Sequence, residues 1–143
     1  MIGVDTTFLV QLELVELPAH KAAHELLQRA ILQPRVSLSL APQVLAEFIH
    51  VVTDPRRFQK PLTADEAIAK ARFWWNAAEV THVFPTDEST RLFLDWMQCH
   101  QLGRKRILDT QLAATLWNAG VRLLFTSNPA DFQIFGFQLL VPT

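Results

Sequence analysis

The chain has 143 residues, 50% of them hydrophobic, and a formal net charge of −1 at pH 7. This length suits one domain over residues 1–143, and the apolar content is enough for a substantial core. The near-neutral charge excludes the strongly basic surface of a general nucleic-acid-binding protein, so any contact with nucleic acid has to come from a local basic patch.

The cysteine content and the N-terminus bear on the compartment. Cys99 is the only cysteine, which excludes an intrachain disulfide and favours a reducing compartment. The first residues lack the pattern of a signal peptide, and no apolar run approaches the roughly eighteen residues that a membrane span needs. We therefore expect a cytoplasmic protein without a membrane partner.

Short apolar runs alternate with longer helical patterns along the chain. In order, we predict a strand over residues 1–4, helices over 8–17 and 19–32, a strand over 35–40, helices over 42–53 and 63–78, a strand over 79–84, helices over 87–99 and 107–119, and strands over 121–125 and 137–141. This rhythm is typical of an α/β fold in which crossover helices connect the strands of a parallel sheet.

Local signals mark several helix ends. Pro18 stops the first helix, and Pro42 suits the first position of the third, where its missing N–H costs nothing. Thr63 and Glu66 have the spacing of a capping box. Gly120 is a usual C-terminal residue of a helix.

One acid follows the first predicted strand directly. That strand is expected to be central if the chain wraps outward from it in both directions, and Asp5 then lies at its carboxyl end. In α/β folds this end faces the crevice in which ligands bind. We interpret Asp5 as the first ligand of a metal site; the alternative is that it only caps the following helix.

Two further acids interrupt apolar stripes of predicted helices. Glu47 lies three and four residues from Val44 and Val51, and Asp109 is in line with Leu112 in the first turn of its helix. A carboxylate on such a stripe is costly to bury unless it is paired or bound to a cation. The alternatives are that Glu47 reaches solvent and that Asp109 complements the helix dipole.

The loop after residue 125 is the fourth candidate. It also follows a strand, and Asn128 and Asp131 are both possible oxygen ligands, with hydroxyl groups from Thr126 and Ser127 nearby. The alternative is an ordinary polar turn that Asn128 initiates before a proline.

These candidates are all expected at the same edge of the sheet. In a parallel sheet, positions directly after strands and positions near the starts of the helices that follow strands both lie at the carboxyl edge. Several hard oxygen donors at one edge suit Mg²⁺ or Mn²⁺ and not zinc. One or two such ions can polarise a phosphodiester and lower the pKa of a bound water. The sequence therefore predicts metal-dependent chemistry on phosphodiesters.

Four segments, in this order, resemble the PIN domain family and within it the VapC-type toxins of bacterial toxin–antitoxin pairs. They are MIGVDTTFLV, LAEFIHVVTDPRRF, ILDTQLAATLWNAGV and LLFTSNPADF. The resemblance covers nearly the whole chain. It implies a three-layer α/β/α sandwich with a mainly parallel central sheet, and an endoribonuclease that hydrolyses single-stranded RNA with Mg²⁺ or Mn²⁺, leaving a 5′-phosphate.

The resemblance also implies roles for individual residues. Asp5, Glu47 and Asp109 fall on three of the family's acidic positions, and Asn128 or Asp131 supplies the fourth; we predict all five as metal ligands and the four acids as catalytic. Because asparagine adds no charge, a non-catalytic PIN-like module that binds RNA or protein remains the alternative function. Thr6 and Thr126 are also predicted to bind substrate, through hydrogen bonds to a ligand acid or a bound water.

An RNA substrate requires cations near these acids. Arg104, Lys105 and Arg106 precede Asp109 and are predicted to bind substrate, and a second basic patch contains Arg56, Arg57 and Lys60. The alternative for both patches is a solvated loop. The resemblance further implies a homodimer and a small cognate antitoxin protein whose C-terminal segment lies in the active-site groove.

Overall fold

A parallel sheet of five short strands forms the centre of the computed structural model, which describes all residues 1–143. The strands are β1 (Ile2–Val4), β2 (Leu38–Leu40), β3 (Val80–His82), β4 (Leu123–Phe125) and β5 (Gln138–Leu140). Their spatial order is β3-β2-β1-β4-β5, and every neighbouring pair is parallel. The prediction that the first strand is central is confirmed.

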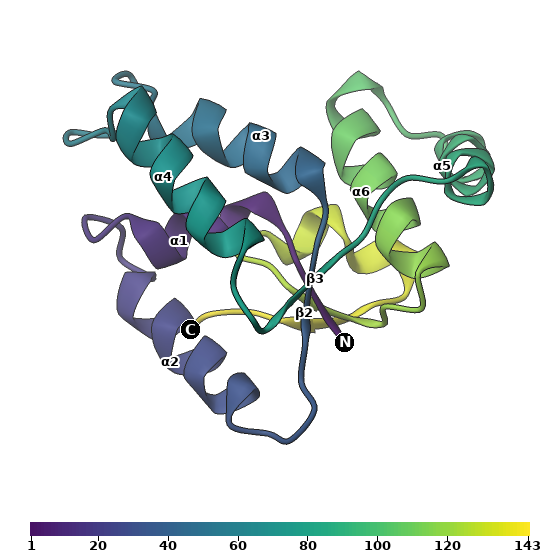
Figure 1. Ribbon diagram of the computed structural model, residues 1–143. Helices are drawn as coiled ribbons and strands as arrows, with labels where there is room; N and C mark the ends of the chain where they lie inside the picture. Colours follow the sequence, from purple (N-terminus) through teal and green to yellow (C-terminus); the bar gives the residue numbers. More distant parts are fainter.

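The helices cover the sheet in two groups. They are α1 (Thr6–Glu13), α2 (His20–Ile31), α3 (Pro42–Val52), α4 (Ala64–Trp75), α5 (Asp87–Cys99) and α6 (Ile107–Asn118). Helix α1 packs on α2 and α3, α3 packs on α4, and α5 packs on α6. Figure 1 shows the first group on one side of the strands and α5 with α6 on the other. The predicted three-layer α/β/α arrangement is therefore confirmed.

The core lies between these layers and brings the site elements close to one another. It is one cluster of 26 buried residues, in which Phe8 of α1 stacks on Phe125 of β4 with ring centroids 4.6 Å apart. Helix α6 passes directly over the central strand, because a Cβ atom on Gly3 would lie only 2.9 Å from Leu116 Cδ1. A crossover helix runs opposite to the parallel strands, so the first turn of α6 lies at the carboxyl edge of the sheet.

Several predicted boundaries were wrong. Helix α1 begins at Thr6 because Asp5 caps it, and it ends at Glu13 instead of residue 17 because Leu14 is extended (φ −105°, ψ 105°) and turns its side chain into the core. Strand β2 begins at Leu38 instead of residue 35, since Arg35 has a left-handed backbone (φ 64°). Helix α4 ends at Trp75, three residues early.

Short 3₁₀ turns, which the sequence did not predict, cover Arg104–Arg106, Pro129–Asp131 and Gln133–Phe135. The capping box at the start of α4 is confirmed, with Thr63 and Glu66 bonded reciprocally. None of the helices combines the length and the apolar character that crossing a membrane requires.

Candidate active site

A pocket of about 410 Å³ opens at the carboxyl edge of the sheet, and its lining residues come from both helix groups. Four carboxylates from four separate segments line it, namely Asp5, Glu47, Asp109 and Asp131. The fold thus brings together all four predicted catalytic acids. The other lining residues are Thr6, Thr7, His50, Val51, Arg57, Leu108 and Leu112.

Asp5 is the most constrained of these acids. It is 2% exposed and caps α1, accepting a 2.8 Å hydrogen bond from the backbone N–H of Phe8. The Thr7 hydroxyl lies 2.9 Å from both carboxylate oxygens, and the Thr126 hydroxyl donates to Oδ2 at 2.5 Å. Burial nevertheless dominates these hydrogen bonds and raises the pKa of Asp5 to about 6. The carboxylate is held in place but lacks a cationic partner.

Glu47 reaches the pocket from the middle of α3, where it is half-buried. The side-chain amide of Gln43, one turn earlier, donates to Glu47 Oε1 at 2.8 Å and to the backbone carbonyl of Leu108 at 2.7 Å. This amide connects the acidic face of α3 to the start of α6. Gln43 therefore orients Glu47 and connects α3 to α6 at the same time.

Asp109 comes from the first turn of α6, which the helix dipole makes favourable for an anion. Burial raises the pKa of Asp109 to about 7, and the neighbouring charges of Asp131, Glu47 and Asp5 add to the shift in that order. The negative charges of the other three acids thus act on Asp109 in addition to its burial. A site of this kind is stabilised by a bound cation.

The conformation of the loop after β4 places only one of the two candidates for the fourth acidic position in the pocket. Asp131 lines the pocket, whereas Asn128 is exposed and does not line it. The Asn128 side-chain amide donates to Asp131 Oδ2 at 2.5 Å, and the Arg106 guanidinium donates to the Asp131 backbone carbonyl at 2.5 Å. Both residues orient Asp131 in this structure.

The residues predicted to bind substrate are placed differently from one another. Thr6 lines the pocket, whereas Thr126 does not line it and contacts two lining residues, Asp5 and Thr7. Arg104 and Lys105 are exposed and lie outside the lining, while the guanidinium of Arg106 is engaged by the Asp131 loop.

Sequence reasoning missed three residues of the site, namely Thr7, Gln43 and His50, and named Arg57 only as a member of a basic patch. Thr7 donates to Asp5 and also accepts from the backbone N–H of Ser127 at 2.9 Å, which joins the ends of β1 and β4. Its position two residues after a capping Asp was the available signal. The i,i+4 spacing of Gln43 and Glu47 was a second such signal. No local pattern pointed to His50, and none singled out Arg57 within its basic patch.

The donor set fits a hard divalent cation in its chemistry. All four acids offer carboxylate oxygens, which Mg²⁺ and Mn²⁺ prefer. Burial, with a smaller contribution from the neighbouring acids, raises the pKa values of Asp5 and Asp109, and a bound cation would favour their charged forms. No group of three or more His, Cys, Asp or Glu side chains lies at metal-binding distances in the structure. The acids therefore share a pocket without forming a closed coordination sphere.

Comparison with known proteins agrees with this fold. No family model matches the chain. The ribonuclease VapC24 of Mycobacterium tuberculosis is 27% identical over 146 aligned residues, which cover 96% of this chain and 92% of that protein.

Solved structures are similar over the whole chain as well. VapC20 of M. tuberculosis, described as a toxin that cleaves the sarcin–ricin loop, has a TM-score of 0.75 at 17% identity, and the match covers 96% of this chain and 98% of that one. A toxin–antitoxin complex from Klebsiella pneumoniae has a TM-score of 0.65 at 16% identity, with coverage of 100% and 98%. The resemblance that the four sequence segments suggested is confirmed, and these structures share the fold.

Proposed function

Because this chain has the PIN fold of the VapC-type proteins and aligns with one of them over 96% of its length, we propose that it is a metal-dependent endoribonuclease acting on single-stranded RNA. One observation carries the proposal: a single pocket gathers four carboxylates from four segments of the chain, the last of them 126 residues after the first. A fold needs no such costly arrangement for stability alone.

In this proposal Asp5, Glu47, Asp109 and Asp131 hold Mg²⁺ or Mn²⁺, and Asn128 orients the last of them. A bound ion of this type lowers the pKa of a water molecule and neutralises charge on the phosphodiester. The chain's own contribution is to hold the carboxylates in fixed directions.

Three hydrogen-bond donors orient the buried carboxylate of Asp5, namely the backbone of Phe8 and the hydroxyls of Thr7 and Thr126. Gln43 does the same for Glu47. Thr6 lines the pocket and is suited to hydrogen-bond a bound water or phosphate oxygen.

The test is cleavage of a broad panel of single-stranded RNAs by the purified protein with Mg²⁺ or Mn²⁺, and with EDTA as the blank. We expect cleavage only with an ion, and its loss in Asp5→Asn and in Asp109→Asn while circular dichroism shows a folded protein. Asp95→Asn, which removes an exposed carboxylate on α5, is the matched control and should cleave like the wild type. If the whole panel stays intact with either ion, the chain is a non-catalytic binding module.

The toxin role, the homodimer and a small antitoxin partner belong to the same proposal. The neighbour that is a toxin–antitoxin complex and the sarcin–ricin-cleaving toxin support the toxin role and the antitoxin partner. A short open reading frame immediately upstream, encoding a DNA-binding N-terminus and a disordered C-terminal tail, would support a cognate antitoxin. We expect its product to co-purify with this chain and to inhibit cleavage in the cytoplasm.

A further inference from the structure

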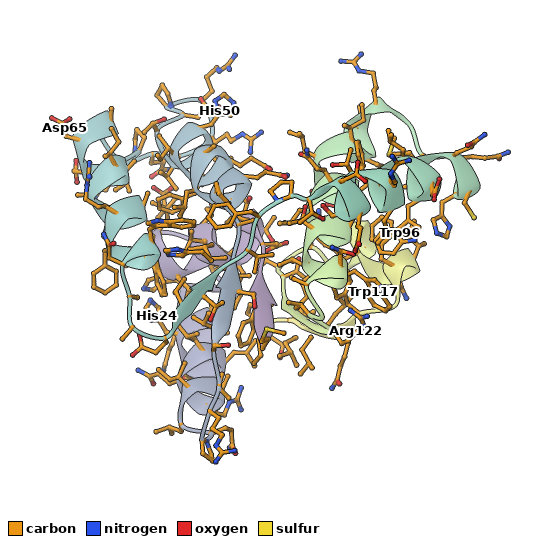
Figure 2. All side chains as sticks on the ribbon, turned by 45° about the vertical axis from the view of Figure 1, so that its right-hand side comes forward. His24, His50, Asp65, Trp96, Trp117 and Arg122 are labelled. Carbon is orange, nitrogen blue, oxygen red and sulfur yellow. The ribbon has the colours of Figure 1, made fainter.

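The acidic pocket has a basic side, which is formed by Arg57 and His50. Both residues line the same pocket as the four carboxylates. His50 lies in the last turn of α3, where Figure 2 shows it near the end of that helix. Arg57 lies in the turn that follows α3.

The guanidinium of Arg57 is paired through its Nε, whereas its two terminal nitrogens have no partner. Its Nε lies 3.6 Å from Asp54 Oδ2, its side chain is 60% exposed, and this ion pair is the only polar contact found for the guanidinium. Asp54 is itself fixed, because its Oδ1 accepts a 2.9 Å hydrogen bond from the backbone N–H of Arg56. The two terminal nitrogens of Arg57 therefore remain available as a planar pair of donors, which matches the oxygens of a phosphate.

The other basic residues of the chain are less suited to this task. Arg104 and Lys105 lie outside the pocket lining, and Arg106 is engaged by the backbone carbonyl of Asp131. An RNA strand brings one negative charge per nucleotide toward four carboxylates, so cations on the pocket wall have to offset the repulsion. His50 and Arg57 are the only basic side chains in that lining.

We propose that Arg57, assisted by His50, binds a backbone phosphate of the RNA next to the bond that is cut. The inference rests on the proposed function and adds a substrate-binding residue to the same site. It predicts that the strand crosses the pocket on the side of the turn after α3, and that Arg57 contributes to substrate binding more than to the chemical step.

The chain offers a matched control in the neighbouring residue. Arg56 belongs to the same turn and pairs with the same carboxylate, its Nε lying 3.4 Å from Asp54 Oδ1, but its side chain is 91% exposed and does not line the pocket. Arg56→Gln thus removes the same charge from the same turn as Arg57→Gln. Any difference between the two variants reports on the pocket and not on net charge.

The first measurement is the affinity of a fluorescent single-stranded RNA for the non-cleaving Asp5→Asn protein with Mn²⁺ across a range of salt concentrations. We expect Arg57→Gln to weaken binding about tenfold and to reduce the slope of log K against log[salt] by about 0.7, the value for one lost phosphate contact on a single strand. Arg56→Gln should change the affinity less than about twofold, because Arg56 lies outside the pocket lining and no phosphate contact is assigned to it. His50→Gln should give a smaller loss than Arg57→Gln.

The second measurement is steady-state cleavage by protein that retains Asp5. Arg57→Gln should raise KM with kcat nearly unchanged, which is the signature of lost substrate binding. Arg57→Lys keeps the charge without the planar pair of donors and should recover part of the affinity.

Equal effects of Arg57→Gln and Arg56→Gln on affinity and salt slope would overturn the inference while leaving the ribonuclease function intact. Conversely, a protein that cuts no RNA but whose RNA binding still depends on Arg57 and not on Arg56 would retain the binding site and lose the proposed enzymatic function. A fall in kcat without a change in KM would also overturn the assignment of Arg57 to substrate binding.

Discussion

Replacing Asp5 with asparagine should stabilise the metal-free protein at neutral pH, although it removes a residue that we propose to be essential for activity. Burial of the Asp5 carboxylate raises its pKa from 3.8 to about 6, so the folded state disfavours the charge that the unfolded state accepts. The stability linked to Asp5 is present in full below about pH 4 and is lost as the pH rises through about 6. Asparagine has no charge to bury and is free of this loss.

The magnitude follows from the pKa shift. At about 1.4 kcal/mol per pKa unit, the shift of Asp5 corresponds to roughly 3 kcal/mol of lost stability above pH 7. The amide of the variant offers one acceptor oxygen where the carboxyl group has two, so the hydrogen bond from Phe8 or the one from Thr126 is lost, at a cost of about 1 kcal/mol. We therefore expect Asp5→Asn to be more stable than the wild type by about 2 kcal/mol at pH 7.5. The advantage should shrink by about 1.4 kcal/mol at pH 5, because the wild-type carboxyl is then mostly protonated in the folded state.

Urea denaturation in EDTA at pH 5 and pH 7.5 measures both quantities, provided that the m-value is unchanged. The exposed-carboxylate variant Asp95→Asn should differ from the wild type by the same small amount at both pH values. Adding millimolar Mn²⁺ should raise the stability of the wild type more than that of Asp5→Asn, because only binding to the folded state stabilises. An equal stability difference between Asp5→Asn and wild type at both pH values would refute the reasoning.

Three further substitutions test the scaffold around the site. Thr126→Val removes a hydroxyl that orients Asp5 and should weaken Mn²⁺ binding, measured by calorimetry, while costing about 1–3 kcal/mol in urea unfolding; unchanged Mn²⁺ affinity would contradict this role. Gly3→Val forces a side chain against Leu116 and should destabilise the protein by about 1–3 kcal/mol without changing the Mn²⁺ dependence of cleavage; a neutral effect on unfolding would show that α6 moves away easily. Gln43→Leu removes the amide that connects α3 to α6 and should lower kcat by about tenfold, because Glu47 loses its orientation. KM should stay nearly unchanged, and a change confined to KM would contradict this role of Gln43.

Local sequence patterns were enough to predict most of the helices and strands and three of the acids that line the pocket. Each of these patterns lies within one or two helical turns. Thr63 could be recognised from its capping box, Pro42 from its position at a helix start, and Glu47 from the apolar residues three and four positions away. The carboxyl edge of a parallel sheet then implied that Asp5 and Asp109 would lie close to Glu47, which the pocket bears out. Helix and strand ends were less predictable, because Leu14 leaves its helix in order to reach the core.

The tertiary structure decided what depends on how loops from distant parts of the chain meet. Nothing local distinguishes Arg57 from Arg56 or Arg104, yet only Arg57 of these three faces the acids, because the turn after α3 packs at the mouth of the pocket. Likewise, Asp131 and not Asn128 enters the pocket, since Arg106, 25 residues away in the chain, holds the backbone of that loop. The sequence by itself determined which carboxylates are available and at which edge of the sheet they gather. Both follow from the hydrophobic periodicity of the helices and strands and from the position of the acids at their ends. Which cations and hydrogen-bond donors surround them depends on packing between segments, which no short-range pattern encodes.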